Sequence, residues 1–342
     1  MVIASGRLIP AKTAAGDSDL QARQIHFTDY TFLKASAKRS GYTVRLWRST
    51  KGAHLALYFN LNANDPVWAP ILRDARFRQA LSLAVDREEI NQVMYYGLAI
   101  AGNNSVLPQS PLYKPEYRDS WAKYDLKRAN ALLDEIGLTK KDSDGIRLLP
   151  NGQPMNLIVE TASQSSEQAD LLELVRDTWR KVGIKLFTKP SQREVFRNRV
   201  MSGETLVSIW SGLNNGLANP LMDPAELAPS HQYQLQWPKW GRYYETGGKA
   251  GTEPDLPAAK ELVELHRAWL GTASAKRREE IWRRMLEIHA REVFTIGLIG
   301  GVPQPVVVDN KLKNVPEKGI YSWSPTAYFG VYKPDSFWFE AG

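Results

Sequence analysis

The sequence predicts an α/β protein, and three observations carry that prediction. Residues 155–210 alternate strand-like and helix-like hydrophobic patterns, in the order strand, helix, strand, helix, strand. The 342 residues are enough for two lobes with separate hydrophobic cores. Hydrophobic residues make up 43% of the chain and charged residues 24%, which is the balance of an ordinary globular protein.

Only short helices and strands are expected in the chain up to residue 73. The polar stretch that ends at Asp19 shows no clear element. A helix is expected over residues 27–37 and ends near Gly41, and strands are expected over residues 43–47 and 55–61. The second strand is almost continuously apolar, so we place it inside a sheet.

Capped amphipathic helices follow. The first is predicted by the spacing of its apolar residues, which is that of one helical face: Phe77, Ala80, Leu81 and Ala84. Asp86 opens the second, since Glu89 follows at the spacing of a capping box. A third helix is expected over residues 125–136 and is stopped by Gly137.

The remaining chain continues to mix helices, strands and turns. We expect a hairpin at residues 145–154, helices at residues 166–182, 192–201, 258–270 and 275–291, and strands at residues 155–160, 184–188, 205–210, 294–298, 305–308 and 329–332. Residues 211–256 are rich in Gly, Asn, Pro, Trp and Tyr, and a loop region of this length is usually functional. The aromatic residues 337–339 are expected in the core.

The composition argues against several classes of chemistry. There is no cysteine, which excludes disulfides and thiolate chemistry. The histidines, none of which has the spacing of a helical zinc pair, are His26, His54, His231, His266 and His289. Phosphate-binding glycine motifs and the Gly-x-Ser-x-Gly motif are absent. We therefore expect no metal site, no cofactor and no enzymatic activity, and we place His266 and His289 on the surface or at an interface.

Charge and hydropathy limit the partners. The formal net charge is +7, but basic and acidic residues are mixed along the chain, so no nucleic-acid partner is expected. No run of apolar residues is long enough to predict a transmembrane helix. The first seven residues reach a charge before an apolar stretch develops, so the chain as written is expected to lack a signal peptide.

Three segments form ordered motifs. Residues 74–87 follow the pattern Asp-x-Arg-x-Arg-x-Ala-x-x-x-Ala-x-Asp-Arg, residues 124–138 form a second helical motif, and residues 16–21 read Gly-Asp-Ser-Asp-Leu-Gln. In pattern and order these segments resemble family 5 extracellular solute-binding proteins, the dipeptide, oligopeptide and nickel binders of ABC importers. The resemblance covers roughly residues 14–340.

This resemblance implies a two-lobed periplasmic-binding-protein clamshell of the type II kind, with the ligand between the lobes. Residues 1–61 would be a remnant of the first lobe up to the first hinge crossing, residues 62–208 a complete C-terminal α/β lobe, and residues 209–342 the return to the first lobe. Because the family's first lobe begins before the present Met1, the first lobe is expected to be incomplete. A periplasmic location, a monomer and ABC permease subunits as partners are implied as well.

The expected ligand site follows the return strand. Trp210, Ser211, Asn214 and Asn215 would lie at the cleft, where amides and an indole suit a neutral or polyhydroxylated ligand. The alternative is a loop held together by its own Asn side chains. Peptide binders of the family carry an Asp after this strand, but no carboxylate occurs here before Asp223, which argues against an ordinary free peptide.

Two further residues are candidates for the site. Trp237 lies in an aromatic and Gln-rich loop that forms either a ligand wall or a self-packed cover. Arg23 could reach an anionic group in the cleft, or form a surface salt bridge instead.

The leading functional hypothesis is the substrate-binding component of an ABC importer, which captures an oligopeptide-like or other small polar solute by lobe closure. A truncated, non-functional remnant of such a protein is the alternative. A hydrolase is a third hypothesis, for which the sequence offers no nucleophile by name.

Overall fold

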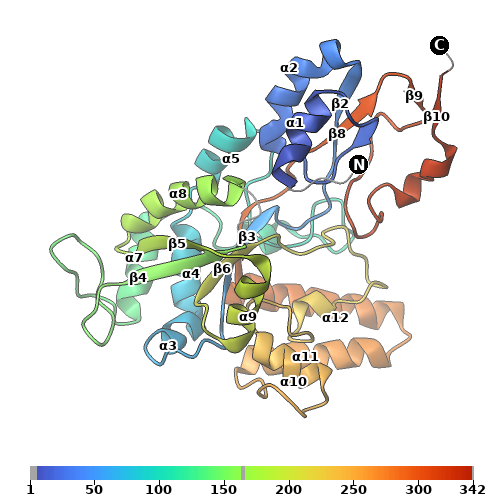
Figure 1. Ribbon diagram of the computed structural model, residues 1–342. Coiled ribbons are helices and arrows are strands. Elements are labelled where there is room, and N and C mark those ends of the chain that lie inside the picture. Colours follow the sequence, from blue (N-terminus) through green and yellow to red (C-terminus); the bar gives the residue numbers. More distant parts are fainter. Residues whose placement is uncertain (1–5, 163–165, 341–342) are drawn as a thin grey trace.

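Two main β-sheets, with a separate two-stranded pairing of residues 312–313 and 338–339, organise the computed structural model, which describes residues 6–162 and 166–340. The smaller sheet has the strand order β1-β8-β2, and the larger one has the order β5-β4-β6-β3-β7. We call residues 6–47 and 304–340 the first lobe and residues 55–299 the second lobe. Figure 1 shows the blue and red ends of the chain together in the first lobe and the intervening colours in the second.

The first lobe joins segments from both ends of the sequence. Its elements are α1 (Ile9–Ala14), β1 (Leu20–Gln21), α2 (Tyr30–Ser40), β2 (Tyr42–Trp47), β8 (Gln304–Asp309), β9 (Leu312–Lys313) and β10 (Trp338–Phe339), with short 3-10 turns at Gly6–Leu8, Phe27–Asp29, Gly330–Tyr332 and Pro334–Ser336. Strand β8 pairs antiparallel with β1 on one edge and β2 on the other. Its apolar centre, residues 305–308, is buried on both faces. Val306 and Val308 belong to one small hydrophobic core, and Val307 belongs to another.

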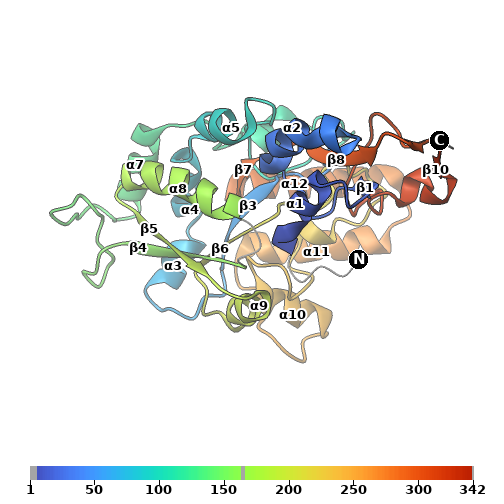
Figure 2. The same ribbon diagram turned by 45° about the horizontal axis from the view of Figure 1, so that its top comes forward.

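The second lobe is a mixed sheet between helical layers. Its strands are β3 (Leu55–Phe59), β4 (Asn156–Thr161), β5 (Lys185–Pro190), β6 (Val207–Trp210) and β7 (Thr295–Ile299). Its helices are α3 (Trp68–Arg73), α4 (Ala75–Leu83), α5 (Arg87–Tyr95), α6 (Pro115–Asp119), α7 (Leu126–Glu135), α8 (Ser166–Arg180), α9 (Arg193–Ser202), α10 (Pro238–Glu245), α11 (Pro257–Gly271) and α12 (Ala275–Glu292), with a 3-10 turn at Ala225–Leu227. Helices α5 and α8 lie on one side of the strands, and α9 and α10 lie on the other (Figure 2).

The motif around residues 74–87 is built from local capping and buried arginines. Asp74 accepts a hydrogen bond from the backbone of Arg76, and Asp86 accepts one from the backbone of Glu89 at 3.0 Å. These two carboxylates cap the N-terminal ends of α4 and α5, and the sequence predicts the cap at Asp86. Arg87 is 2% exposed and donates to the carbonyl of Gly297, so it ties α5 to strand β7.

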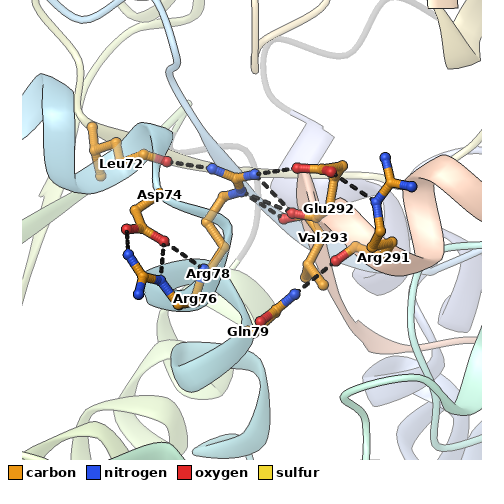
Figure 3. A network of polar contacts seen from close by, with 8 residues as sticks. All are labelled: Leu72, Asp74, Arg76, Arg78, Gln79, Arg291, Glu292 and Val293. Atoms are coloured by element: carbon orange, nitrogen blue, oxygen red, sulfur yellow. Dashed lines mark hydrogen bonds and ion pairs between the residues drawn. The ribbon is translucent and has the colours of Figure 1, made fainter. Parts of the chain in front are cut away.

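Arg78 joins α4 to the end of the distant helix α12. Its guanidinium is fully buried and donates to the carbonyl oxygens of Leu72, Glu292 and Val293, at 2.7 to 3.1 Å (Figure 3). The carbonyls at the end of a helix have no partner within that helix. Arg78 supplies the hydrogen bonds that these groups would otherwise lack.

Two segments connect the lobes, residues 48–54 and residues 300–303. The two segments meet the second lobe side by side. There the backbone N–H of His54 donates a hydrogen bond of 2.7 Å to the carbonyl of Ile299, the residue just before the second segment. Gly52 is required in the first segment, because a Cβ atom there would strike the carbonyl oxygen of Ser105. Substrate closure in a two-lobed protein requires hinges of this kind.

The lobe boundaries differ from those expected from the sequence. The boundary expected at residue 61 comes just after β3, and the one expected at residue 208 falls within β6; β3 and β6 are paired neighbours inside the second lobe's sheet. Strand β7 pairs with the other edge of β3, so the chain stays in the second lobe until Ile299. Residues 213–294 also share a core with Leu61 and Tyr117 of the same lobe.

Several local expectations were also wrong. The stretch before Asp19, expected to be irregular, contains α1. Residues 329–332, expected as a strand, contain a 3-10 turn. Trp338 and Phe339, expected in the core, are each 54% exposed. These errors fall near the chain ends, where short segments have little periodicity to read.

Candidate functional site

A cavity of about 500 Å³ lies at the junction of the two lobes. The first lobe lines it with residues 22–27, Gln304 and residues 321–324 and 328. The connecting segments add Ser49, Lys51, His54, Val302 and Pro303, and the second lobe adds Arg193, Trp210, Ser211 and Asn214. The volume lies within the range of about 300–1,000 Å³ that is usual for small-molecule sites.

The first-lobe wall is aromatic. Arg23 lies over the ring of Tyr328, with 5.4 Å between its guanidinium carbon and the ring centroid. Tyr321 and Trp323 pack against the same ring, at 5.0 Å and 5.7 Å between centroids. Trp323 remains 70% exposed, so a broad apolar face is available to a solute at the mouth of the cavity.

Trp210 stands at the end of strand β6 and forms the second-lobe wall. Its indole stacks on Phe196 at 5.9 Å, and the guanidinium of Arg193 lies 5.5 Å from its ring centroid. The next residue, Ser211, is anchored through its carbonyl oxygen, which accepts a hydrogen bond of 2.6 Å from Tyr58. Asn214 is anchored by Glu226, which accepts from both its backbone and its side-chain N–H groups at 2.9 Å.

A buried carboxylate joins elements from three parts of the chain. Glu167 of α8 is 3% exposed, and its oxygens lie 3.4 Å from Nδ1 of His26 and 3.1 Å from Nε2 of His54. Tyr95 donates its hydroxyl to the same carboxylate at 2.9 Å. His26 belongs to the first lobe, His54 to a connecting segment and Glu167 to the second lobe, so we call these three residues the interlobe cluster.

The interlobe cluster shifts the pKa values of its members. The hydrogen bond to Glu167 raises the pKa of His26, against the opposing effect of burial. Burial alone would raise the pKa of Glu167, but the charge of His54 and the hydrogen bonds of both histidines hold it well below its usual value. Burial also lowers the pKa of Lys51, which faces this cluster.

Four predicted site residues line the cavity, namely Arg23, Trp210, Ser211 and Asn214. Asn215 does not: its side chain bonds to Met222 and to the backbone of Leu217, as in the self-held loop that was the alternative interpretation. Arg23 forms no ion pair with a carboxylate among the described residues. The surface salt bridge that was the alternative role for Arg23 is therefore absent from this part of the chain. The ligand roles of all these residues remain predictions.

Trp237 is packed in the core and lines no part of the cavity. It is 0% exposed, its ring contacts His289 and Phe294, and its indole N–H donates to Gln234. The aromatic part of the loop around Trp237 and Trp240 thus packs into the core of the second lobe and does not line this cavity. His266, expected at the surface or at an interface, is 4% exposed and bonds to Asp223. His289, for which the same was expected, bonds to the carbonyl of Leu227, and burial lowers its pKa to about 4.

Sequence reasoning missed His26, Lys51, His54, Trp323 and Tyr328. No local spacing connects them, because the connecting segments and the last stretch of the chain bring them together only in the fold. The one available signal was the density of aromatic and hydroxyl residues in segment 321–328, which lacks helical or strand periodicity.

The described residues contain neither a cluster of metal-ligating side chains nor a helix that could cross a membrane. No group of three or more His, Cys, Asp or Glu side chains in that part of the chain could hold a metal ion. The helices of the described chain are also too short or too polar to span a bilayer.

Two lobes, paired connecting segments and a cavity between them are the features of the periplasmic-binding-protein fold. The chain belongs to the bacterial extracellular solute-binding proteins, family 5, whose middle region matches residues 7–264. This family consists of binding proteins, and the similar solved structures are binding proteins as well.

Individual relatives bind different solutes. The dipeptide-binding protein of Escherichia coli K12 is 28% identical over 171 residues, which are 49% of this chain and 30% of that protein. The periplasmic alpha-galactoside-binding protein of Rhizobium meliloti is 20% identical over 259 residues, which are 74% of this chain and 36% of that protein. The relatives therefore indicate a family but no single ligand.

Solved structures agree with the fold. The oligopeptide-binding protein OppA matches with a TM-score of 0.73 and 29% identity, over 99% of this chain and 56% of that one. The periplasmic binding protein MelB from Agrobacterium fabrum C58, in complex with stachyose, matches with a TM-score of 0.79 and 18% identity, over 99% of this chain and 51% of that one. The chain thus spans about half the length of these proteins.

Proposed function

We propose that this chain is the solute-capturing part of an ABC importer and that it binds a small polar solute in the cavity between its lobes. The observation that carries the proposal is that both lobes and the connecting segments line one cavity of about 500 Å³. A solute that contacts both walls binds the closed arrangement better than the open one, and it therefore shifts the population toward closure. We propose further that the chain acts in the periplasm and that its closed form is recognised by the permease subunits in the membrane, as the family implies.

The proposal predicts ligand-dependent stabilisation of the purified chain. A library of short peptides, oligosaccharides and small organic acids should contain at least one solute that raises the Tm, because binding to the folded state alone stabilises it. Isothermal titration calorimetry would confirm a stoichiometry near one. If a cooperatively folding chain binds no member of the library, the proposed function is contradicted.

Trp210→Ala should weaken binding of any such solute by at least about 10-fold, since the indole offers the second-lobe wall its largest stacking face. Trp338→Ala is the matched control, because Trp338 is 54% exposed and lines no part of the cavity. Equal affinities for the two variants in calorimetry would place the solute elsewhere.

A further inference from the structure

The cavity between the lobes is lined by cations and not by carboxylates. Arg23 contributes from the first lobe, Lys51 from a connecting segment and Arg193 from the second lobe. Among the described residues, no Asp or Glu side chain lines this cavity. The imbalance is local, since the chain as a whole has 37 acidic residues beside its 44 basic ones.

The two arginines are held by rings and not by acids. Arg23 lies over Tyr328 and Arg193 over Trp210, and neither forms an ion pair with a described carboxylate. A ring below a guanidinium orients its plane, while the N–H groups at its edge can still bind a carboxylate or phosphoryl oxygen. Both side chains are exposed, so a solute can reach them.

Two carboxylates close to the cavity wall, Glu167 and Glu226, are already engaged in hydrogen bonds. Glu167 is 3% exposed and bonds to His26, His54 and Tyr95 behind the cavity wall. Glu226 lines an adjoining, smaller cavity that shares Trp210, Ser211 and Asn214 with this one, and it accepts two hydrogen bonds from Asn214. Neither carboxylate neutralises Arg23 or Arg193 within ion-pair distance.

We propose that the solute is anionic and that its carboxylate or phosphoryl groups are shared by Arg23, Lys51 and Arg193. This inference rests on the proposed function and specifies its substrate class. Positive charges on both walls oppose closure of the empty cleft, because like charges repel as they approach. An anion between the walls turns that repulsion into attraction, whereas a neutral solute leaves it in place. The aromatic faces of Trp210, Trp323 and Tyr328 would hold the uncharged part of the solute.

Matched probes of similar size test the charge requirement. The peptide arm compares Glu-Glu with Gln-Gln, the sugar arm compares glucose 6-phosphate with glucose, and the acid arm compares citrate with its trimethyl ester. We expect the anionic member of at least one pair to bind about 10- to 100-fold more tightly, and its affinity to fall as the NaCl concentration rises. The arm that responds identifies a carboxylate or a phosphoryl solute.

Charge-removing variants locate the anion. Arg23→Gln, Lys51→Gln and Arg193→Gln should each weaken the anionic probe by about 10-fold or more and reduce the salt dependence. Lys249→Gln, on the exposed turn after α10, should change neither quantity. Circular dichroism and the Tm of each ligand-free variant would separate loss of binding from loss of folding.

The outcomes separate this inference from the proposed function. If neutral members bind as well as anionic ones, or if the three variants behave like Lys249→Gln, the anionic class is wrong and the binding function stands. If a folded chain binds neither these probes nor any member of the wider library, the proposed function itself fails, and the substrate class with it.

Discussion

Arg78→Met is expected to lower the free energy of unfolding by about 4 kcal/mol. The guanidinium of Arg78 is fully buried, and burial lowers its pKa to about 10, so it is still protonated at neutral pH. Its hydrogen bonds satisfy the carbonyl of Leu72 in the last turn of α3, and the carbonyls of Glu292 and Val293 where α12 ends and the chain turns into β7. Methionine fills part of the space but leaves these acceptors without donors.

Two further variants make the Arg78 test specific. Arg78→Lys retains a charge but lacks the planar guanidinium that donates to several carbonyls at once. Its free energy of unfolding should therefore lie between those of the wild type and Arg78→Met. Arg76→Gln is the control, since Arg76 lies on the surface and pairs only with Asp74 two residues away (Figure 3). Chemical denaturation would give the order, and equal midpoints for Arg78→Met and Arg76→Gln would refute the structural role of Arg78.

Glu167→Gln is expected to cost about 3 kcal/mol of stability, which is typical for breaking a buried charged pair. The carboxylate connects His26 of the first lobe to His54 of the connecting segment and to Tyr95 of the second lobe. An amide keeps the shape but cannot accept from all three groups through two charged oxygens. Because the lost contacts join the lobes, limited proteolysis should also cut the connecting segments of the variant faster.

The stability of the wild-type chain should depend on pH through the same cluster. His26 has a raised pKa, so its stabilisation is complete below the ordinary value of 6.5 and is lost as the pH rises through the raised value. Glu167 has a lowered pKa, so its stabilisation is present above the ordinary value of 4.5 and is lost as the pH falls toward the lowered value. The cluster therefore contributes most between these two pH values. Lys51 opposes and Asp29 supports the charge on His26.

Glu167→Gln should flatten this profile, since the variant lacks the charge to which His26 responds. His231→Gln is the control, because His231 is exposed and pairs with Glu245 outside the interlobe cluster. Thermal unfolding measured from pH 4 to 8 checks both statements. A profile that keeps its shape in Glu167→Gln would show that other groups set the pH dependence.

Helices with a clear period were predictable because their information is local. The face of α4 and the caps of α4 and α5 come from residues within a few positions of one another, and the structure contains them. The same holds for the alternating elements between residues 155 and 210. The strand expected over residues 55–61 was right for residues 55–59, because a nearly continuous apolar run is typical of a strand buried on both faces.

Lobe membership was not predictable in the same way. Strands β3 and β6 have the hydrophobic pattern of buried strands wherever they lie, so the pattern could not reveal that they pair with each other. That β7 closes the same sheet depends on contacts across more than two hundred residues of intervening chain. The boundaries at residues 61 and 208 were therefore misplaced.

By itself, the sequence determined the α/β class, most of the helices and the family, since these depend on local period, capping and ordered motifs. It also brought Arg23, Trp210, Ser211 and Asn214 forward as candidates for the cleft. Only the tertiary structure decided that His26, His54 and Glu167 meet and that Trp237 is buried away from the cavity. The burial and the charge pairing of these residues depend on segments that are distant in sequence. No local sequence pattern indicates which of these segments will be in contact.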